Sequence, residues 1–92
     1  IMPEGDMDIY TSGTFKEDVL NSFEKTPTDL LIDGEKLDYI DSTGLGAMIG
    51  ILKKVKEHDH KIYLQNIKSN IKKLFDITEL DKLFVFRGDS NE

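Results

Sequence analysis

The sequence predicts an α/β fold, a mixed sheet of four to five strands with helices packed mainly on one face. Apolar runs of strand length alternate along the chain with segments whose apolar residues recur at helical spacing. No repeat, linker or low-complexity block interrupts this alternation. With 92 residues the chain is expected to form a single domain over 1–92. Strands that alternate with helices are typical of helices laid on a sheet.

The first third of the chain combines the end of a strand with an amphipathic helix. Residues 1–3 are predicted to end a strand, and residues 4–6 to form a turn. The helix is predicted to begin at Thr14, which fits a capping box with Glu17, although Ser12 competes for the N-cap position. Its apolar residues recur at helical spacing and are Phe15, Val19, Leu20 and Phe23.

The middle of the chain holds the strongest predicted helix. Pro27 ends the first helix, and the continuous apolar run 30–32 is typical of a strand covered on both faces. Residues 37–40 lead into a turn at 41–44. The helix after this turn has lysines on its polar side, and its apolar side follows the i, i+3, i+4, i+7 pattern with Leu45, Met48, Ile49, Leu52 and Val55.

The last third is expected to contain a strand, a short helix, one further helical turn and a final strand. The strands are expected at residues 62–65 and 84–86, and the helix near 70–76. Leu80 and Leu83 indicate the additional helical turn between that helix and the last strand.

Composition and charge exclude several classes of function. Hydrophobic residues make up 38% and charged residues 33% of the chain, a balance typical of globular proteins. The formal net charge of -6 argues against nucleic acid and against an anionic membrane as partners. No cysteine is present, which excludes disulfides and cysteine nucleophiles and fits a cytoplasmic protein. The longest apolar stretch, residues 45–52, is far shorter than the about 20 residues of a membrane helix.

Residues 41–46, Asp-Ser-Thr-Gly-Leu-Gly, are the most informative stretch. They place hydroxyls and a glycine at a predicted strand-to-helix junction, where free backbone N–H groups favour an anion. The glycine spacing and the Gly-Lys pair of a P-loop are missing, as is the glycine two residues before Ser42 that a nucleophile elbow needs. One interpretation is that Asp41, Ser42 or Thr43 simply caps the helix. If Asp41 or Thr43 is the cap, the Ser42 hydroxyl is left free for a modification that the fold tolerates.

The residues around this motif argue against an enzyme and against a metal site. A serine hydrolase needs a base beside its hydroxyl, but both histidines lie beyond the far end of the helix, and His58 is on the order of 24 Å from Ser42. The His-Asp-His segment 58–60 lacks a third metal ligand and fits a polar turn better. The aspartates of segment 6–8 also fit a solvated turn better than a Mg²⁺ site. No catalytic residue, metal or cofactor is therefore expected.

Gly46 and Gly50 form a G-x-x-x-G pair on the predicted central helix. Each glycine costs a helix roughly 1 kcal/mol relative to alanine, so a packing reason is expected. The pair either allows close packing of this helix on the sheet or on a neighbouring helix, or leaves a smooth strip for a partner protein.

At residues 41–46 the chain resembles the STAS domain family, and specifically its bacterial anti-sigma factor antagonists. Two further stretches match in register. Segment 5–8 followed by Tyr10-Thr11-Ser12 resembles the family's entry into its first helix, and segment 74–78 resembles the segment after its third helix. Because the motif contains Ser-Thr rather than Ser-Ser, the chain resembles the antagonists of the general stress response. The resemblance implies a STAS-like fold.

The resemblance also implies a phosphorylation switch. In such proteins the unphosphorylated form binds an anti-sigma factor that is also a serine kinase, and so releases the sigma factor. The kinase uses ATP to phosphorylate the serine after the motif aspartate, here Ser42, which ends binding until a PP2C-type phosphatase restores it. The nucleotide and Mg²⁺ belong to the kinase, so the chain itself needs no cofactor. Partner binding is implied for Asp8, Asp41, Ser42, Thr43, Gly44, Leu45 and Gly46.

The alternative that the sequence leaves open is a STAS scaffold, or a nucleotide-sensing module, of a stress-signalling or transport complex. Such a module need not be phosphorylated at Ser42 by an anti-sigma kinase. Phosphorylation of Ser42 by a cognate kinase, or binding of a nucleotide to the isolated domain, would separate the two functions.

The chain departs from the family pattern in three places. The family has about a strand and a half before the position of Ile1 and a further helix after Phe86; without them an open sheet edge predicts a truncated chain or a strand-swapped dimer. Glu79 stands where the family often has glycine, which is expected to alter the turn after residue 78. Segment 58–60 replaces a turn that usually contains glycine.

Overall fold

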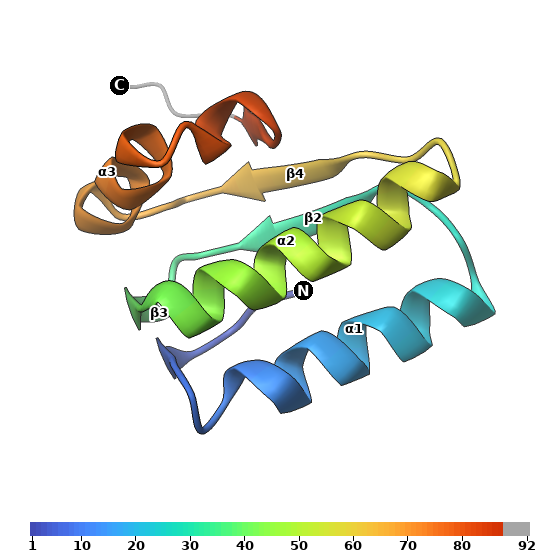
Figure 1. Cartoon of the computed structure of the whole chain (residues 1–92), viewed down its shortest axis with the longest axis horizontal. Coiled ribbons are helices and arrows are strands. Elements are labelled where there is room, and N and C mark those ends of the chain that lie inside the picture. The colour runs from blue at the N-terminus through green and yellow to red at the C-terminus, as the bar shows by residue number, and fades with distance from the viewer. Residues whose placement is uncertain (88–92) are drawn as a thin grey trace.

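The computed structural model describes residues 1–87 of the chain. The described part confirms the α/β class and contains three α-helices and five strands (Figure 1). The elements in chain order are β1 (Gly5–Met7), α1 (Ser12–Lys25), β2 (Leu30–Asp33), β3 (Leu37–Ile40), α2 (Ser42–Glu57), β4 (Ile62–Gln65), α3 (Ser69–Ile77), the 3-10 turn η1 (Leu80–Lys82) and β5 (Val85–Arg87). The expectation about a further helix after Phe86 concerns residues that lie outside the described part.

The strands form two sheets, and the pairs found within residues 1–87 are all parallel. β1 pairs with β3, while β4 lies between β2 and β5. The prediction of a mixed sheet was therefore wrong for the described strand pairs. Parallel neighbours need a crossover connection, and α3 supplies one between β4 and β5.

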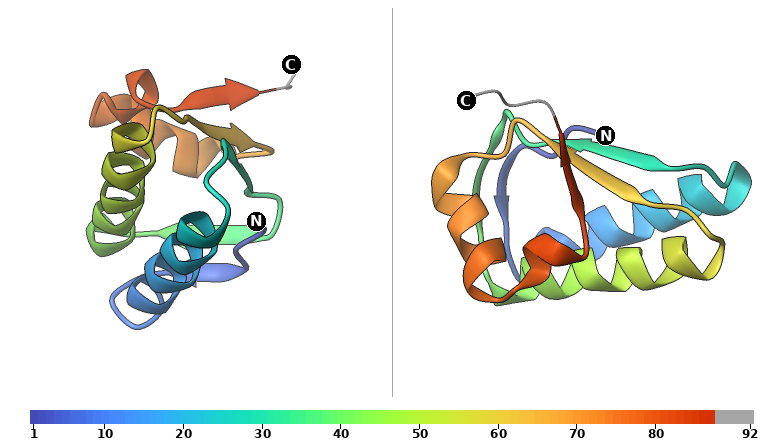
Figure 2. Two further views of the ribbon diagram at one scale, coloured as in Figure 1. Left: turned by 90° about the vertical axis from the view of Figure 1, so that its right-hand side faces the viewer. Right: turned by 90° about the horizontal axis from the view of Figure 1, so that it is seen from above.

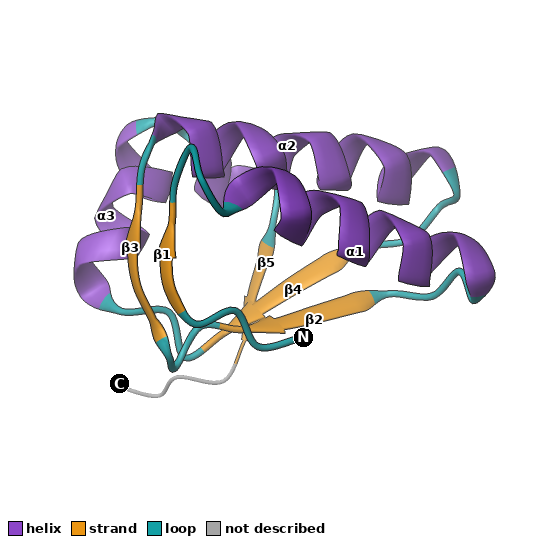
Figure 3. Ribbon diagram, turned by 90° about the horizontal axis from the view of Figure 1, so that it is seen from below, coloured by secondary structure: helices purple, strands orange, loops and turns teal. Residues whose placement is uncertain are grey.

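The helices cover one side of the strands, as expected. α1 and α2 lie side by side above the strand layer in Figure 3, and the two views of Figure 2 show the same arrangement from other directions. Within residues 1–87, no helix combines the length and the apolar character that crossing a bilayer would require. The side chains buried most completely between the layers are Phe23, Ile32, Ile40, Ile51, Val55, Ile62, Leu64, Ile71 and Phe75.

The first strand lies where the sequence predicted a turn. β1 covers Gly5–Met7, not residues 1–3, and its pairing with β3 begins at Gly5 opposite Leu37. The Gly5 N–H donates to the Lys36 carbonyl at 2.9 Å. Gly5 has a φ of 70°, a conformation that glycine adopts at little cost. Because glycine is also typical of turns, the sequence predicted a turn at this position.

The helix boundaries follow the prediction closely except at the start of α1. The N-cap of α1 is Thr11, so neither the capping box between Thr14 and Glu17 nor a Ser12 cap is formed. Ser12 is instead buried in the first turn. The reason is the loop before Thr11, whose own hydrogen bonds fix the start of the helix.

Two of the departures from the family pattern have left-handed backbone conformations. Asp59 and Glu79 have φ values of 60° and 61°, in the region where glycine is most easily accommodated. Glu79 therefore adopts a glycine-like backbone conformation after α3, and Asp59 does the same after α2. In both residues the Cβ makes this backbone conformation more costly than it would be for glycine.

Candidate functional site

The predicted site lies at the edge of the molecule where β1 and β3 end. These strands run parallel with Met7 opposite Ile40, so the connections into α1 and α2 leave the sheet at the same edge (Figure 3). The Asp41 N–H donates to the Met7 carbonyl at 3.2 Å and ties the two connections together. The structure thus brings Asp8, which follows Met7, next to the 41–46 motif.

Asp41 is the residue that caps α2. Its backbone is extended, with φ −110° and ψ −173°, and its Oδ1 accepts the Gly44 N–H at 2.9 Å. Its carbonyl accepts the Leu45 N–H at 2.9 Å. Of the three candidate caps in the sequence, Asp41 therefore takes the role, and its side chain satisfies the Gly44 N–H, one of the free donors at the helix start.

Gly44 and Leu45 face the interior. A Cβ added to Gly44 would collide with the Met7 carbonyl oxygen and would lie 2.6 Å from Ile40 Cγ1. Leu45 is only 8% exposed and belongs to the hydrophobic core. These two residues position the first turn of α2 on the strand ends, and because both are buried they offer a partner little surface.

Ser42, Thr43 and Gly46 face outward. Ser42 is the first residue of α2, both hydroxyl residues are exposed, and neither hydroxyl forms a hydrogen bond with any other residue of the described chain. Gly46 is also exposed, and a Cβ there would meet nothing within 4 Å. The outward half of the motif therefore presents two free hydroxyls and an unobstructed backbone.

Asp8 organises the neighbouring loop. Its Oδ1 accepts the N–H groups of Tyr10 at 2.9 Å and of Thr11 at 3.2 Å, and its carbonyl accepts the Ser12 N–H at 2.8 Å. The Thr11 hydroxyl in turn donates to the Asp6 carbonyl at 2.7 Å. Asp8 lies next to the motif, and it fixes the loop that enters α1.

The loop exposes two large side chains that were not predicted as site residues from the sequence. Ile9 and Tyr10 are 69% and 89% exposed. The available signal was a pair of large apolar residues between Asp8 and Thr11, in a segment that otherwise has the composition of a polar turn.

The family model of the STAS domain matches residues 1–92. The chain belongs to the STAS domain family. This STAS domain is 33% identical over 79 residues to the anti-sigma-B factor antagonist of Staphylococcus aureus, a match that covers 86% of this chain and 73% of that protein. The family resemblance seen in the sequence is thereby confirmed.

Two solved structures share the fold of this STAS domain. A Thermotoga maritima protein, provisionally described as an anti-sigma factor antagonist, superposes with a TM-score of 0.89 at 21% identity, over 98% of this chain and 78% of that one. The anti-sigma factor antagonist SpoIIAA in its unphosphorylated form gives a TM-score of 0.76 at 17% identity, over 97% and 77%. At these identities the likeness concerns the fold.

The two glycines of the G-x-x-x-G pair have different surroundings in the STAS domain. A Cβ on Gly50 would lie 2.6 Å from Lys16 Nζ and 2.8 Å from its Cε, so this glycine accommodates a lysine from α1. The atoms closest to Gly50 belong to the flexible end of the Lys16 side chain, so this contact does not by itself require glycine. The surface above Gly46 is open.

The far end of α2 carries the polar segment 58–60. His60 Nδ1 lies 3.1 Å from Asp29 Oδ1, and His58 Nδ1 lies 3.1 Å from the Lys54 carbonyl oxygen. The Lys61 N–H and then His60 stabilise the Asp29 carboxylate and hold its pKa below the usual value. Both histidines therefore make contacts at this turn. Among residues 1–87 no group of three potential metal ligands comes together.

Proposed function

We propose that this STAS domain is a bacterial, cytoplasmic anti-sigma factor antagonist that is switched by phosphorylation of Ser42. In this proposal the unphosphorylated domain binds an anti-sigma factor with serine kinase activity and so releases the sigma factor. The observation that carries the proposal is that Asp41 caps α2 and leaves the exposed Ser42 hydroxyl free. The relative at 33% identity, named an anti-sigma-B factor antagonist, supports it.

The position of Ser42 separates the effect of a phosphate on the fold from its effect on a partner. At the first residue of a 16-residue helix, the dipole favours an anion by roughly 0.3–1 kcal/mol, which offsets the nearby Asp41 carboxylate. A partner that covers Ser42 would instead have to remove nearly two charges from water. Phosphorylation should therefore leave the domain folded and release the partner.

The chain supplies only the acceptor hydroxyl for this transfer. The Ser42 oxygen attacks the γ-phosphorus of ATP, the bond to the bridging oxygen breaks, and ADP leaves. Asp8 and Asp41 use Oδ1 to accept backbone N–H groups that order this edge, and we assign the acceptor of the Ser42 proton to the kinase. A PP2C-type phosphatase would restore the hydroxyl by hydrolysing the phosphate ester.

A two-stage experiment tests the proposal. Affinity capture from a source-cell lysate with wild type and Ser42→Glu is followed by identification of the retained proteins by mass and purification of the anti-sigma factor. Titration should then show that Ser42→Ala keeps its affinity and accepts no phosphate from labelled ATP. Ser42→Glu should bind at least about tenfold more weakly, a loss of about 1.4 kcal/mol. Thr43→Ala is the matched control and should be phosphorylated normally.

Other outcomes would favour the alternative. If wild type and Ser42→Glu retain the same proteins, or neither retains a kinase, the domain is better explained as a scaffold or nucleotide-sensing module. Equal affinity of wild type and Ser42→Glu for the purified anti-sigma factor would contradict the switch directly.

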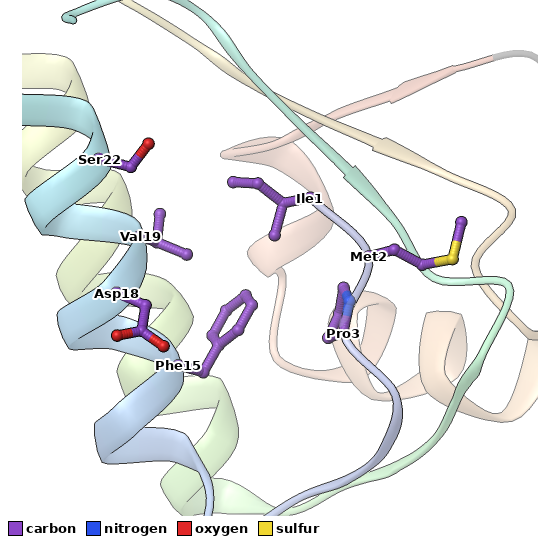
Figure 4. Close-up of a pocket in the computed structure, with 7 residues that line it drawn as sticks. All are labelled: Ile1, Met2, Pro3, Phe15, Asp18, Val19 and Ser22. Atoms are coloured by element: carbon purple, nitrogen blue, oxygen red, sulfur yellow. The ribbon is translucent and has the colours of Figure 1, made fainter.

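We also propose that the outer edge of β2 can pair with a strand from a second copy. Among the described residues only Ile1 pairs with this edge: its amino group donates to the Leu31 carbonyl at 3.0 Å, and its carbonyl accepts the Asp33 N–H at 2.8 Å. Beside it lies a cavity of about 240 Å³ whose walls come from segment 1–3 and one face of α1 (Figure 4). Pairing at a single residue of this edge, next to an apolar cavity, suits strand exchange. A monomer mass in light scattering at high concentration would contradict this dimer.

A further inference from the structure

The connection between β1 and α1 exposes two large apolar side chains that the fold does not use. Ile9 is 69% exposed and Tyr10 is 89% exposed, and neither belongs to the hydrophobic core. Two adjacent exposed side chains of this size give an interface apolar area to bury. Tyrosine in particular is enriched among the residues that dominate protein–protein binding.

The loop that carries these side chains is already ordered by its own hydrogen bonds. Asp8 accepts the Tyr10 N–H through its side chain and the Ser12 N–H through its carbonyl, at 2.9 and 2.8 Å. The Asp8 N–H donates to the Thr11 hydroxyl at 3.0 Å. A preorganised loop loses little conformational entropy on association, so its contacts contribute more fully to affinity.

The exposed pair lies at the same edge of the molecule as Ser42. The hydrogen bond from Asp41 to the Met7 carbonyl joins the two connections, with Ile9 two residues after Met7 and Ser42 one residue after Asp41. Resting on the proposed function, we infer that Ile9 and Tyr10 are the apolar anchor through which this domain docks on its anti-sigma factor. The two side chains enter an apolar pocket of that protein, while Ser42 is covered by the adjoining surface.

Charge argues for a different protein rather than a second copy as the occupant. Segment 6–11 and segment 41–48 contain three aspartates and no lysine or arginine. A two-fold contact between copies through this edge would place Asp6, Asp8 and Asp41 of one chain against the same residues of the other. Like charges brought together in this way oppose association, whereas a different protein is free of that repulsion.

The test is a titration of the purified anti-sigma factor, obtained as described above, with matched variants. Tyr10→Ala is expected to bind about 30-fold more weakly or worse, and Ile9→Ala about fivefold more weakly. The control variants Tyr39→Ala and Ile77→Ala remove exposed side chains of the same types, 51% and 76% exposed, on β3 and at the end of α3. They should bind within about twofold of wild type. Thermal unfolding of each variant establishes that it is folded.

The possible outcomes separate this inference from the proposed function. Wild-type affinity for both Tyr10→Ala and Ile9→Ala, together with weak binding of Ser42→Glu, would overturn the inference and leave the function standing. A wild type that binds no anti-sigma factor would overturn both. Sedimentation supplies the third outcome: a wild-type dimer that Tyr10→Ala converts to monomer would show that a second copy covers the pair, and would overturn the inference.

Discussion

The two ends of α2 are both rich in polar side chains, yet they differ in how much of their bonding capacity is used. At the far end, His60 and the Lys61 N–H share the Asp29 carboxylate at 3.1 and 3.0 Å. The rings of His58 and His60 also lie nearly perpendicular to the Phe23 ring, with centroids 5.4 and 5.9 Å away. At the start of the helix, Ser42 and Thr43 are exposed and their hydroxyls make no bond within residues 1–87.

This difference shows which polar groups remain available for chemistry. A polar group that already has a partner stabilises the local structure and has little left to offer a ligand. The His-Asp-His segment has the more suggestive composition, but its histidines are engaged in a turn. The Ser-Thr pair looks like ordinary capping residues, but Asp41 caps the helix and leaves the pair unused.

The largest change in stability is expected for a substitution at Gly44, near the start of α2. Gly44→Ala should lower the free energy of unfolding by about 3 kcal/mol, because the new methyl group would overlap the Met7 carbonyl and Ile40. Gly46→Ala is the matched control and should raise the free energy of unfolding by about 0.5–1 kcal/mol, because a Cβ there meets open space. Urea denaturation measures both, and equal effects at the two glycines would contradict the structure.

A smaller effect should separate the two neighbours at the helix start. Asp41→Ala should cost about 1 kcal/mol of stability, because the Gly44 N–H loses the carboxylate that accepts it. Ser42→Ala should change stability by less than about 0.5 kcal/mol, because its hydroxyl carries no structural bond. Asp41→Ser keeps a capping oxygen and should fall between the two. Thermal unfolding of the three variants checks this order, and a costly Ser42→Ala would show that the hydroxyl is structural.

The smallest change in stability is expected for a substitution at Asp59, in the turn after the far end of α2. Asp59→Gly should raise the free energy of unfolding by up to about 1 kcal/mol, because Asp59 has a φ of 60° that glycine adopts without strain. It should leave binding to the anti-sigma factor unchanged, since this turn lies at the opposite end of α2. Chemical denaturation and the titration described above measure the two quantities. Destabilisation, or weaker binding, would show that the Asp59 side chain has a role beyond the turn.

Most helices and strands could be predicted from the local pattern of apolar residues. The wrong predictions concern segments whose structure depends on contacts with distant parts of the chain. The apolar repeat of α2 and the run in β2 identified both elements, because each reflects burial of its own residues. β1 was missed because three residues beginning with glycine form a strand only when β3 pairs with them. The start of α1 was placed too late because the Asp8 loop fixes it from outside the helix.

The site was predictable in composition but not in orientation. The sequence gives the position of the 41–46 motif, and the helical pattern places it at a helix start. Which of its residues face inward depends on how closely α2 approaches β1, and that approach is visible only at Gly44. In the same way, the neighbouring α1 decides that Gly50 is packed against Lys16 while Gly46 stays open.

A single carbonyl oxygen joins the two segments of the proposed docking surface, the loop with Ile9 and Tyr10 and the start of α2 with Ser42. The Met7 carbonyl accepts the Asp41 N–H, and it is also the atom against which Gly44 packs. Segments separated by more than thirty residues of sequence therefore share one anchoring atom. A protein that binds the Tyr10 loop meets Ser42 at the separation that this shared contact sets. In the proposed switch, a phosphate on Ser42 would then act on the partner through its charge, without a change of shape in the domain.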